Sequence, residues 1–204
     1  MTGNSALKMD ANIVVLGTDN VGKSALAVRF LTRRFIGEYG DIGKLISSVG
    51  YYLTVYSALP QQDPSSGSPT REKRLQWAGG FVLVYSICDR ASFNTVTRLT
   101  QSIKAAKDYL GLEKVPITIV GNKRDLHHRR TVLSEEGRLL ALASDCQFYE
   151  VSAAENYHGV LMVFHGLVKR VREFRLIAAK KPGGIKGIVK SMSAVFARRR
   201  TDSL

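Results

Sequence analysis

The sequence contains little cysteine: only Cys88 and Cys146 occur in 204 residues, and they lie far apart. This spacing supports neither a disulfide framework nor a zinc site, so we expect a reducing, intracellular setting. No apolar run approaches the roughly 18 residues that span a bilayer. The first ten residues lack the apolar segment of a secretory signal. The sequence therefore predicts a protein that is soluble or peripherally attached to a membrane.

Acidic residues are also scarce, since 17 Asp and Glu stand against 30 Lys and Arg, a formal net charge of +13. Residues 176–204 hold seven basic residues and one acid, so this segment carries +6 of that total. Such an excess at one end predicts an anionic partner for the tail. The length and the apolar fraction of 45% are those of one globular domain with appendages.

Short apolar strands alternate with amphipathic helices over most of the chain. The predicted strands are Asn12–Gly17, Phe81–Ser86, Ile117–Gly121 and Phe148–Val151. The predicted helices are Lys23–Phe35, Ala91–Leu110, Leu133–Ser144 and Tyr157–Leu176, with Ser134 as the N-cap of the third. This alternation predicts an α/β fold, with a mostly parallel central sheet that is covered by helices on both faces.

Residues 46–74 depart from this alternation. Ile46–Ala58 is one β-rich run that is broken only by Gly50. The run QQDPSSGS at residues 61–68, followed by Pro69 and the charged segment Arg71–Arg74, predicts a long mobile loop.

The segment Gly17–Ser24, GTDNVGKS, has the pattern G-x-x-x-x-G-K-S between a predicted strand and a predicted helix. Glycines at both ends let the backbone wrap a phosphate, with N–H groups pointing inward at the helix N-terminus. Lys23 is placed to reach the β- and γ-phosphates, and the Ser24 hydroxyl to bind Mg²⁺. A glycine-rich turn with a surface lysine is the alternative interpretation. The predicted phosphate-binding residues are Gly17, Asp19, Asn20, Val21, Gly22, Lys23, Ser24 and Ala25.

A second motif, Asn122-Lys123-Arg124-Asp125, follows the predicted strand that ends at Gly121. A carboxylate at Asp125 can accept both N–H groups on the Watson–Crick edge of guanine, whereas adenine would leave it unsatisfied. We expect Asn122 to tie this loop to the phosphate loop and the stem of Lys123 to lie over the base. After the next strand, backbone N–H groups of Ser152–Ala154 are expected to meet guanine O6.

In their order and spacing these motifs resemble the small GTPases of the Ras superfamily over about residues 10–175. The segments SALAVRFLTRRFIGEY, WAGGFVLVYSICDR and GNKRDL are most similar to the RERG-like branch, the Ras-related and oestrogen-regulated growth inhibitor and its relatives. The resemblance implies a P-loop small G domain that binds GTP or GDP with Mg²⁺ and acts in signalling as a monomer. It also implies that Phe35 packs on guanine. The predicted base-binding residues are therefore Phe35, Asn122, Lys123, Asp125, Ser152, Ala153 and Ala154.

The switch motifs depart from this family. Ile42 stands where the family has a Thr that binds Mg²⁺, and Ser57 stands where it has an Asp that holds Mg²⁺ through water. Pro60 replaces the Gly whose N–H grips the γ-phosphate, and proline has no N–H. Gln61 remains at the position of the Gln that orients the attacking water, so it is a candidate catalytic residue. A solvated loop glutamine is the alternative.

Spacing differs as well, because only 17 residues lie between Tyr39 and Ser57. Either the hairpin of the second and third strands is shortened, turning near Val49-Gly50, or one edge strand is missing. Ser47 or Ser48 is the alternative metal ligand if the loop is reshaped. Divergence and an alternative splice form both remain as explanations.

The phosphate loop carries Asp19 and Asn20 where Ras itself has two glycines. A side chain at Asp19 crowds the attacking water and an incoming arginine finger, and its charge faces the γ-phosphate. Nucleotide binding can tolerate this, because backbone N–H groups and Lys23 still hold the β-phosphate. Together with Ile42, Ser57 and Pro60, these differences predict a GTP hydrolase with a very low intrinsic rate and a weakened Mg²⁺ site.

The sequence predicts three parts: a short N-terminal tail at 1–9, the G domain at 10–175 and a basic tail at 176–204. Residues 184–197 within that tail have the pattern of a basic amphipathic helix. It could bind a membrane or partner, provide a nuclear or nucleolar address, or dock on its own domain. The terminus Thr201–Leu204 contains no Cys, so no prenyl anchor is expected and a cytoplasmic location is the default.

Three hypotheses follow. The first is a guanine-nucleotide switch that hydrolyses GTP slowly, and the second is a pseudo-GTPase adapter that binds nucleotide without switching. The third makes the basic tail the working part, bound to RNA or anionic lipid.

Overall fold

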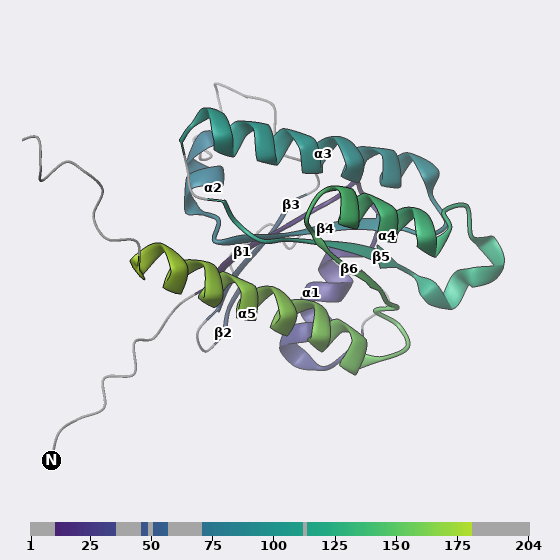
Figure 1. Cartoon of the computed structure of the whole chain (residues 1–204). Helices are drawn as coiled ribbons and strands as arrows, with labels where there is room; N and C mark the ends of the chain where they lie inside the picture. Colours follow the sequence, from purple (N-terminus) through teal and green to yellow (C-terminus); the bar gives the residue numbers. More distant parts are fainter. Residues whose placement is uncertain (1–10, 36–45, 49–50, 57–70, 112–113, 181–204) are drawn as a thin grey trace, which may run out of the picture.

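The computed structural model describes residues 11–35, 46–48, 51–56, 71–111 and 114–180 (Figure 1). They form a six-stranded sheet in the order β2-β3-β1-β4-β5-β6. The strands are β1 Ala11–Leu16, β2 Ile46–Ser48, β3 Tyr51–Tyr56, β4 Gly80–Ser86, β5 Ile117–Asn122 and β6 Gln147–Glu150. Five strands run parallel, and only β2 is antiparallel to its neighbour. This confirms the predicted α/β fold.

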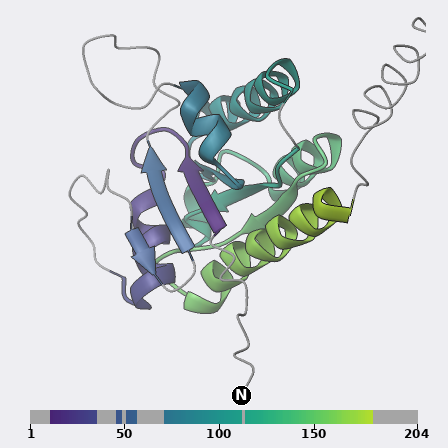
Figure 2. The same cartoon turned by 90° about the vertical axis from the view of Figure 1, so that its left-hand side faces the viewer.

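Helices cover both faces of the sheet (Figure 2). They are α1 Lys23–Thr32, α2 Arg71–Trp77, α3 Arg90–Tyr109, α4 Ser134–Ala143 and α5 Tyr157–Lys180, with a 3₁₀ segment η1 at Arg124–Arg129. One buried cluster joins α1 and α5 to the sheet, and a second joins α3 and α4 to the opposite face. Phe30 of α1 stacks on Phe164 of α5 at 4.3 Å between ring centroids. Burial of Phe164 stabilises the fold by roughly 1.5–3 kcal/mol.

The hairpin is shortened rather than lost. Strand β2 pairs with β3 in the register Ser48↔Tyr51 and Ile46↔Leu53, which leaves two residues between the strands. The sheet therefore keeps its edge strand with only three residues in it. The predicted turn at Val49-Gly50 lies outside the described residues.

Three local predictions were wrong. Helix α1 ends at Thr32, not at Phe35, because Arg33 adopts a left-handed conformation with φ 62° and closes the helix. The N-cap of α4 is Leu133 rather than Ser134, and the Glu136 carboxylate accepts the Leu133 backbone N–H at 2.9 Å. A helix, α2, replaces the predicted loop at Arg71–Arg74; burial of Leu75 against the α3 face of the sheet stabilises it.

Helix α5 extends past the predicted end of the domain at residue 175 and reaches Lys180. Its inner face holds the apolar stripe that the helical period predicts, with Val160, Phe164, Leu167 and Val171 buried. Among the described residues, no helix is long and apolar enough to cross a membrane.

Candidate functional site

The segment Gly17–Ser24 is a tight turn that joins β1 to α1, and both of its glycines are required by close contacts. A Cβ on Gly17 would lie 2.2 Å from the backbone oxygen of Val84 in the neighbouring strand. Gly22 has φ 93°, and a Cβ there would lie 2.3 Å from Nδ2 of Asn122. Only glycine lets the turn lie this close to β4 and to Asn122.

The N-terminus of α1 is open to an anion. Gly22 is its N-cap, no side chain caps it, and its first turn contains no acidic residue. The first backbone N–H groups of a helix lack intrahelical acceptors and carry the positive end of the helix dipole. Ser24, the candidate Mg²⁺ ligand, lies in this turn and is half-buried, while Ala25 is buried in the core. The turn can therefore hold a phosphate through its backbone.

Lys23 lies across the phosphate loop with only 7% of its surface exposed. Its Nζ donates to the backbone oxygen of Thr18 at 2.6 Å and lies 3.9 Å from Oδ1 of Asp19. Burial lowers the pKa of Lys23, and the Asp19 carboxylate opposes this effect. Asp19 is mostly exposed, and its carboxylate is the described acidic group nearest to the Lys23 ammonium.

Asn20 lies in the phosphate loop with φ 61°, in the left-handed region that favours glycine. Asparagine tolerates this conformation better than most residues. An asparagine can therefore occupy this position of the loop at little cost in backbone strain.

Asn122 connects three loops through its buried side chain. Its Nδ2 donates to the backbone oxygen of Val21 at 2.8 Å, and its Oδ1 accepts the Ala153 N–H at 3.1 Å. Only 2% of Asn122 is exposed. The phosphate loop and the loops after β5 and β6 are thereby held together at the carboxyl ends of the parallel strands, where open α/β sheets bind ligands.

Asp125 is held by Ser152. The Ser152 hydroxyl donates to Oδ1 of Asp125 at 2.6 Å and accepts the backbone N–H groups of Ala154 and Glu155, both at 3.1 Å. The carboxylate keeps further lone pairs for a purine edge. The sequence predicts that the N–H groups of Ala153 and Ala154 meet guanine O6. In the structure they donate to Asn122 Oδ1 and Ser152 Oγ, so a bound O6 would share these N–H donors with the two side chains.

Lys123 and Phe35 are the two remaining predicted base-binding residues. Lys123 has φ 67°, a left-handed conformation that turns the chain sharply between β5 and η1. Phe35 is 44% exposed, three residues beyond the end of α1. An aromatic ring left this open can pack against a bound base.

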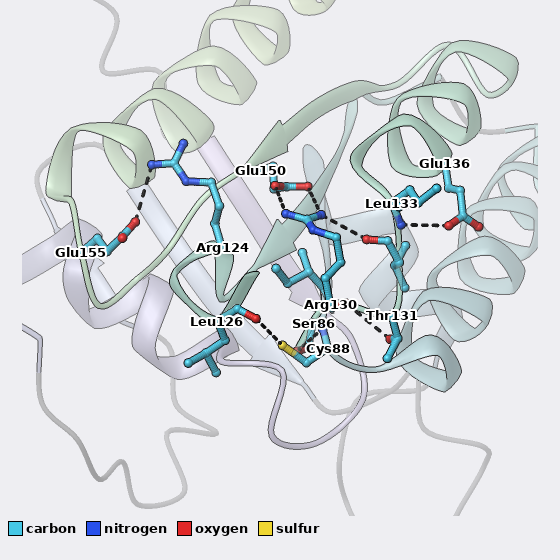
Figure 3. Close-up of polar contacts among 12 residues, drawn as sticks. Ser86, Cys88, Arg124, Leu126, Arg130, Thr131, Leu133, Glu136, Glu150 and Glu155 are labelled. Atoms are coloured by element: carbon cyan, nitrogen blue, oxygen red, sulfur yellow. Dashed lines mark hydrogen bonds and ion pairs between the residues drawn. The ribbon is translucent and has the colours of Figure 1, made fainter. Parts of the chain in front are cut away.

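We call the loop after β5, with residues 123–125, and the loop after β6, with residues 152–155, the base loops. An ion pair that no sequence motif indicates joins them. Arg124 Nη2 lies 3.5 Å from Oε2 of Glu155, so a residue of the N-K-R-D motif meets the residue that follows Ser-Ala-Ala (Figure 3). Both side chains are about half exposed. No sequence signal marks this pair, because the two residues are brought together only by the parallel pairing of β5 and β6.

We expect Arg124→Ala to accelerate release of a fluorescent GDP analogue by no more than about fivefold, because exposed ion pairs contribute about 0.2–1 kcal/mol. Glu155→Ala should have a similar effect, and the double variant should be no faster than either single one. The acceleration should shrink at high salt, since the pair is screened. Additive effects in the double variant would contradict a direct pairing.

A second ion pair joins the residue that follows η1 to the end of β6, next to the base loops. Arg130 Nη2 lies 2.7 Å from Oε1 of Glu150, the last residue of β6, and both side chains are largely buried (Figure 3). The Arg130 guanidinium, through its hydrogen bonds, lowers the pKa of Glu150. Glu136 is held in the same way by Arg90, which lowers its pKa to about 2. A carboxylate in a half-buried strand requires a partner, so Glu150 was the detectable sequence signal.

Acid should destabilise the protein partly through Glu150. Its folded pKa is depressed, so its contribution is complete above the unfolded value near 4.5 and is lost as pH falls below it. Glu150→Gln should therefore lower the free energy of unfolding at pH 7 and flatten its decline below pH 4.5. Urea unfolding at pH 7 and pH 3 measures this, with the exposed Glu135→Gln as control. Parallel declines in wild type and Glu150→Gln would contradict the assignment.

Several predicted site residues lie outside the described residues: Ile42, Ser57, Pro60 and Gln61. Ser47 and Ser48 belong to β2, but their side chains are not described. Within the described residues, no group of three or more His, Cys, Asp or Glu side chains could hold a metal ion. Ser24 is thus the described candidate ligand for the Mg²⁺ that accompanies a nucleotide.

Comparison with known proteins agrees with this geometry. The profile of the Ras family matches residues 68–173. The chain is 38% identical to the Ras-related and estrogen-regulated growth inhibitor-like protein of Bos taurus over 199 residues, covering 94% of this chain and 98% of that protein. It is 39% identical to Ras-like protein family member 11A of Rattus norvegicus, over 86% of this chain and 76% of that protein. It is 37% identical to human Ras-related and estrogen-regulated growth inhibitor, with coverages of 86% and 88%.

The fold and the three connected loops define a P-loop nucleotide-binding domain of the small-G-domain class. The Ras family profile begins only at residue 68, but the similarity to the first relative covers 94% of the chain and therefore includes the phosphate loop. The chain belongs to the Ras family of small GTPases, in its RERG-like branch. It is therefore a Ras-like, GTP-binding signalling protein, of a family that binds guanine nucleotide with Mg²⁺.

Proposed function

We propose that this protein holds guanine nucleotide tightly but hydrolyses GTP at close to the background rate. The hydrogen bonds of Asn122 support tight nucleotide binding, because they hold the phosphate loop and both base loops together. Asp125, oriented by Ser152, would select guanine by accepting its two Watson–Crick N–H groups. Lys23 and the N–H groups of α1 would hold the β-phosphate.

Asp19 supports the second half of the proposal. Its carboxylate lies 3.9 Å from the Lys23 ammonium. A γ-phosphate bound to Lys23 would be repelled by this charge, and the side chain would crowd the attacking water. The sequence adds Ile42, Ser57 and Pro60, which lack the oxygen ligands and the backbone N–H that the family uses. With Gln61 as the remaining catalytic group, water would be poorly oriented and the transition state poorly stabilised.

Single-turnover hydrolysis of bound GTP tests this proposal, after HPLC has identified the nucleotide that copurifies with the protein. We expect a rate below about 10⁻⁴ s⁻¹, several times slower than the intrinsic rate of Ras. Asp19→Gly is the matched variant, and its rate should stay low because the switch substitutions remain. A rate in the ordinary Ras range for either protein would contradict the proposal.

The Mg²⁺ site should also be weak, since Ser24 is the remaining side-chain ligand at family positions. We expect EDTA to accelerate release of a fluorescent GDP analogue by less than about threefold, because little of the affinity depends on the metal. A large acceleration by EDTA would refute this. Titration with Mg²⁺ should likewise change the release rate only slightly.

The switch substitutions equally favour a pseudo-GTPase adapter, whose partners recognise one fixed surface. Equal affinity of a binding partner for the GDP and GTP forms would distinguish it from a switch. The basic tail supports peripheral attachment to an anionic membrane or nuclear and nucleolar targeting of an otherwise cytoplasmic protein. Association with RNA is the remaining alternative, and loss of localisation on neutralising Arg198–Arg200 would favour the tail as an address.

A further inference from the structure

Two adjacent cavities lie at the end of the domain opposite the phosphate loop. Their volumes are about 180 and 300 Å³, and they share the lining residues Lys107, Lys114, Val115, Pro116 and Phe174. We call the two together the basic hollow. Pro116 immediately precedes β5, whereas Asn122 ends it, so the hollow lies at the amino ends of the parallel strands. A six-residue strand spans roughly 20 Å, which separates the hollow from the nucleotide loops.

Its walls include the C-terminal end of α3, the loop before β5 and the C-terminal half of α5. Asp145, before β6, completes the smaller cavity, and the end of α2 with the residues that connect it to β4 completes the larger one. Figure 1 shows α2 and the C-terminal end of α5 at the same, left-hand end of the molecule. Residues far apart in the sequence therefore meet around one concave surface.

Positive charge dominates the described lining. It contains five cations, Lys104, Lys107, Lys114, Arg170 and Arg175, against two carboxylates, Asp108 and Asp145. Asp145 lies 4.0 Å from Arg170, and Lys104 donates to the backbone oxygen of Ser144, so these contacts fix the outer wall. Cations converging from separate elements on one cavity are the arrangement that binds phosphate groups.

The larger cavity contains no described carboxylate. Its cations are Lys107, only 5% exposed, together with Lys114 and Arg175. The Arg175 guanidinium lies against Gly79, where a Cβ would come within 3.0 Å of Nη2. Phe174 and Val171 supply apolar surface beside these charges. The cavity thus combines cations with a surface that can contact the face of a ring.

We propose that the basic hollow is a second ligand site that binds a ring-bearing organic polyphosphate, such as a phosphorylated cyclitol. Its phosphates would bind Lys107, Lys114 and Arg175, and its ring would lie on Phe174. The chain's own tail does not suit this site, because residues 176–204 carry a charge of +6. The concave shape and dispersed cations favour a compact small anion over an extended acidic peptide. The same headgroup could belong to a soluble molecule or to a phosphoinositide lipid.

The chain carries its own reporter for this test. Trp77 is its only tryptophan, lines the larger cavity and is 38% exposed. Full-length protein, held in excess GDP and Mg²⁺, would be titrated with inositol trisphosphate while tryptophan emission and calorimetric heat are followed. We expect saturable binding that changes the emission of Trp77. The absence of saturable heat at millimolar probe would overturn the proposal.

Variants locate the binding. Lys114→Gln combined with Arg175→Gln should weaken it at least about tenfold, because charge-assisted contacts to phosphate are lost. Lys169→Gln combined with Arg172→Gln removes the same charge from exposed positions of α5 that line neither cavity, and should weaken binding by less than about twofold. Equal weakening by both pairs would assign the binding to non-specific charge. Lys114→Glu alone, at an exposed position, covers the case in which the Arg175 variant fails to fold.

Two further arms separate the possible sources. The probe should not displace a bound fluorescent GDP analogue, and displacement would place the probe in the phosphate loop and refute the hollow as its site. Vesicles of phosphatidylcholine with or without phosphatidylinositol bisphosphate then test the lipid. Recruitment that needs the bisphosphate lipid, and that is lost in the Lys114/Arg175 variant but not in the Lys169/Arg172 control, would identify the lipid headgroup as the ligand. Equal recruitment to both kinds of vesicle, together with saturable binding of the soluble probe, would identify a soluble ligand.

Discussion

Replacing Asp125 with asparagine should lower the affinity for GDP by roughly 100-fold, since hydrogen bonds to a charged group contribute about 1.5–3 kcal/mol each. Xanthine carries an oxygen where guanine carries its exocyclic amine, so the asparagine NH₂ can donate to it. We therefore expect the affinity for xanthosine diphosphate to rise in the same variant. Competition of both nucleotides against a fluorescent GDP analogue measures the exchange of preference.

The position of Asp125 makes this substitution informative. Ser152 donates to Oδ1 at 2.6 Å, and asparagine can keep this contact by presenting its own Oδ1. The backbone of both base loops should then remain as it is, and the change in affinity reports base recognition. Asp145→Asn is a suitable control, because that carboxylate is 91% exposed and lies at the far end of the sheet. An unchanged preference for guanine would mean that Asp125 does not contact the base.

Gly17→Ala should lower the free energy of unfolding by at least about 3 kcal/mol, because overpacking against a fixed backbone cannot be relieved. The added Cβ would lie 2.2 Å from the backbone oxygen of Val84. Val84 belongs to the centre of the sheet, where β4 is paired on both sides by β1 and β5. The phosphate loop would have to move away from β4, so nucleotide binding should be lost as well.

Gly111→Ala provides the matched control. Gly111 also has a positive φ, of 60°, but nothing lies within 4 Å of an added Cβ. That substitution should cost about 1 kcal/mol through backbone strain alone. Urea unfolding of the two nucleotide-free variants separates the contact from the strain. Equal losses in both would show that the approach to Val84 contributes nothing.

The sequence predicted that the phosphate and base loops follow β1, β5 and β6, because their motifs depend on residue type and short-range spacing. The nucleotide contacts of their residues stay predictions. A G-x-x-x-x-G-K-S segment between a strand and a helix specifies a turn that presents backbone N–H groups, whatever surrounds it. The alternation of strands and helices followed from their hydrophobic periods in the same way, except at α2, where a loop was predicted. Predicted helix ends were wrong where the backbone adopts a conformation that the pattern of apolar side chains does not indicate. An example is Arg33, whose left-handed conformation ends α1.

Tertiary structure decided which distant residues meet. Parallel pairing of β4, β5 and β6 places Asn122 between Val21 and Ala153, and Arg124 beside Glu155. It also gathers Lys107, Lys114 and Arg175 around one cavity, although each belongs to a different element. The sequence by itself determined which residue types the nucleotide loops present and where along the chain they lie, because these features are local. The ion pairs and the basic hollow depend on contacts across the sheet, and only the folded chain fixes their geometry.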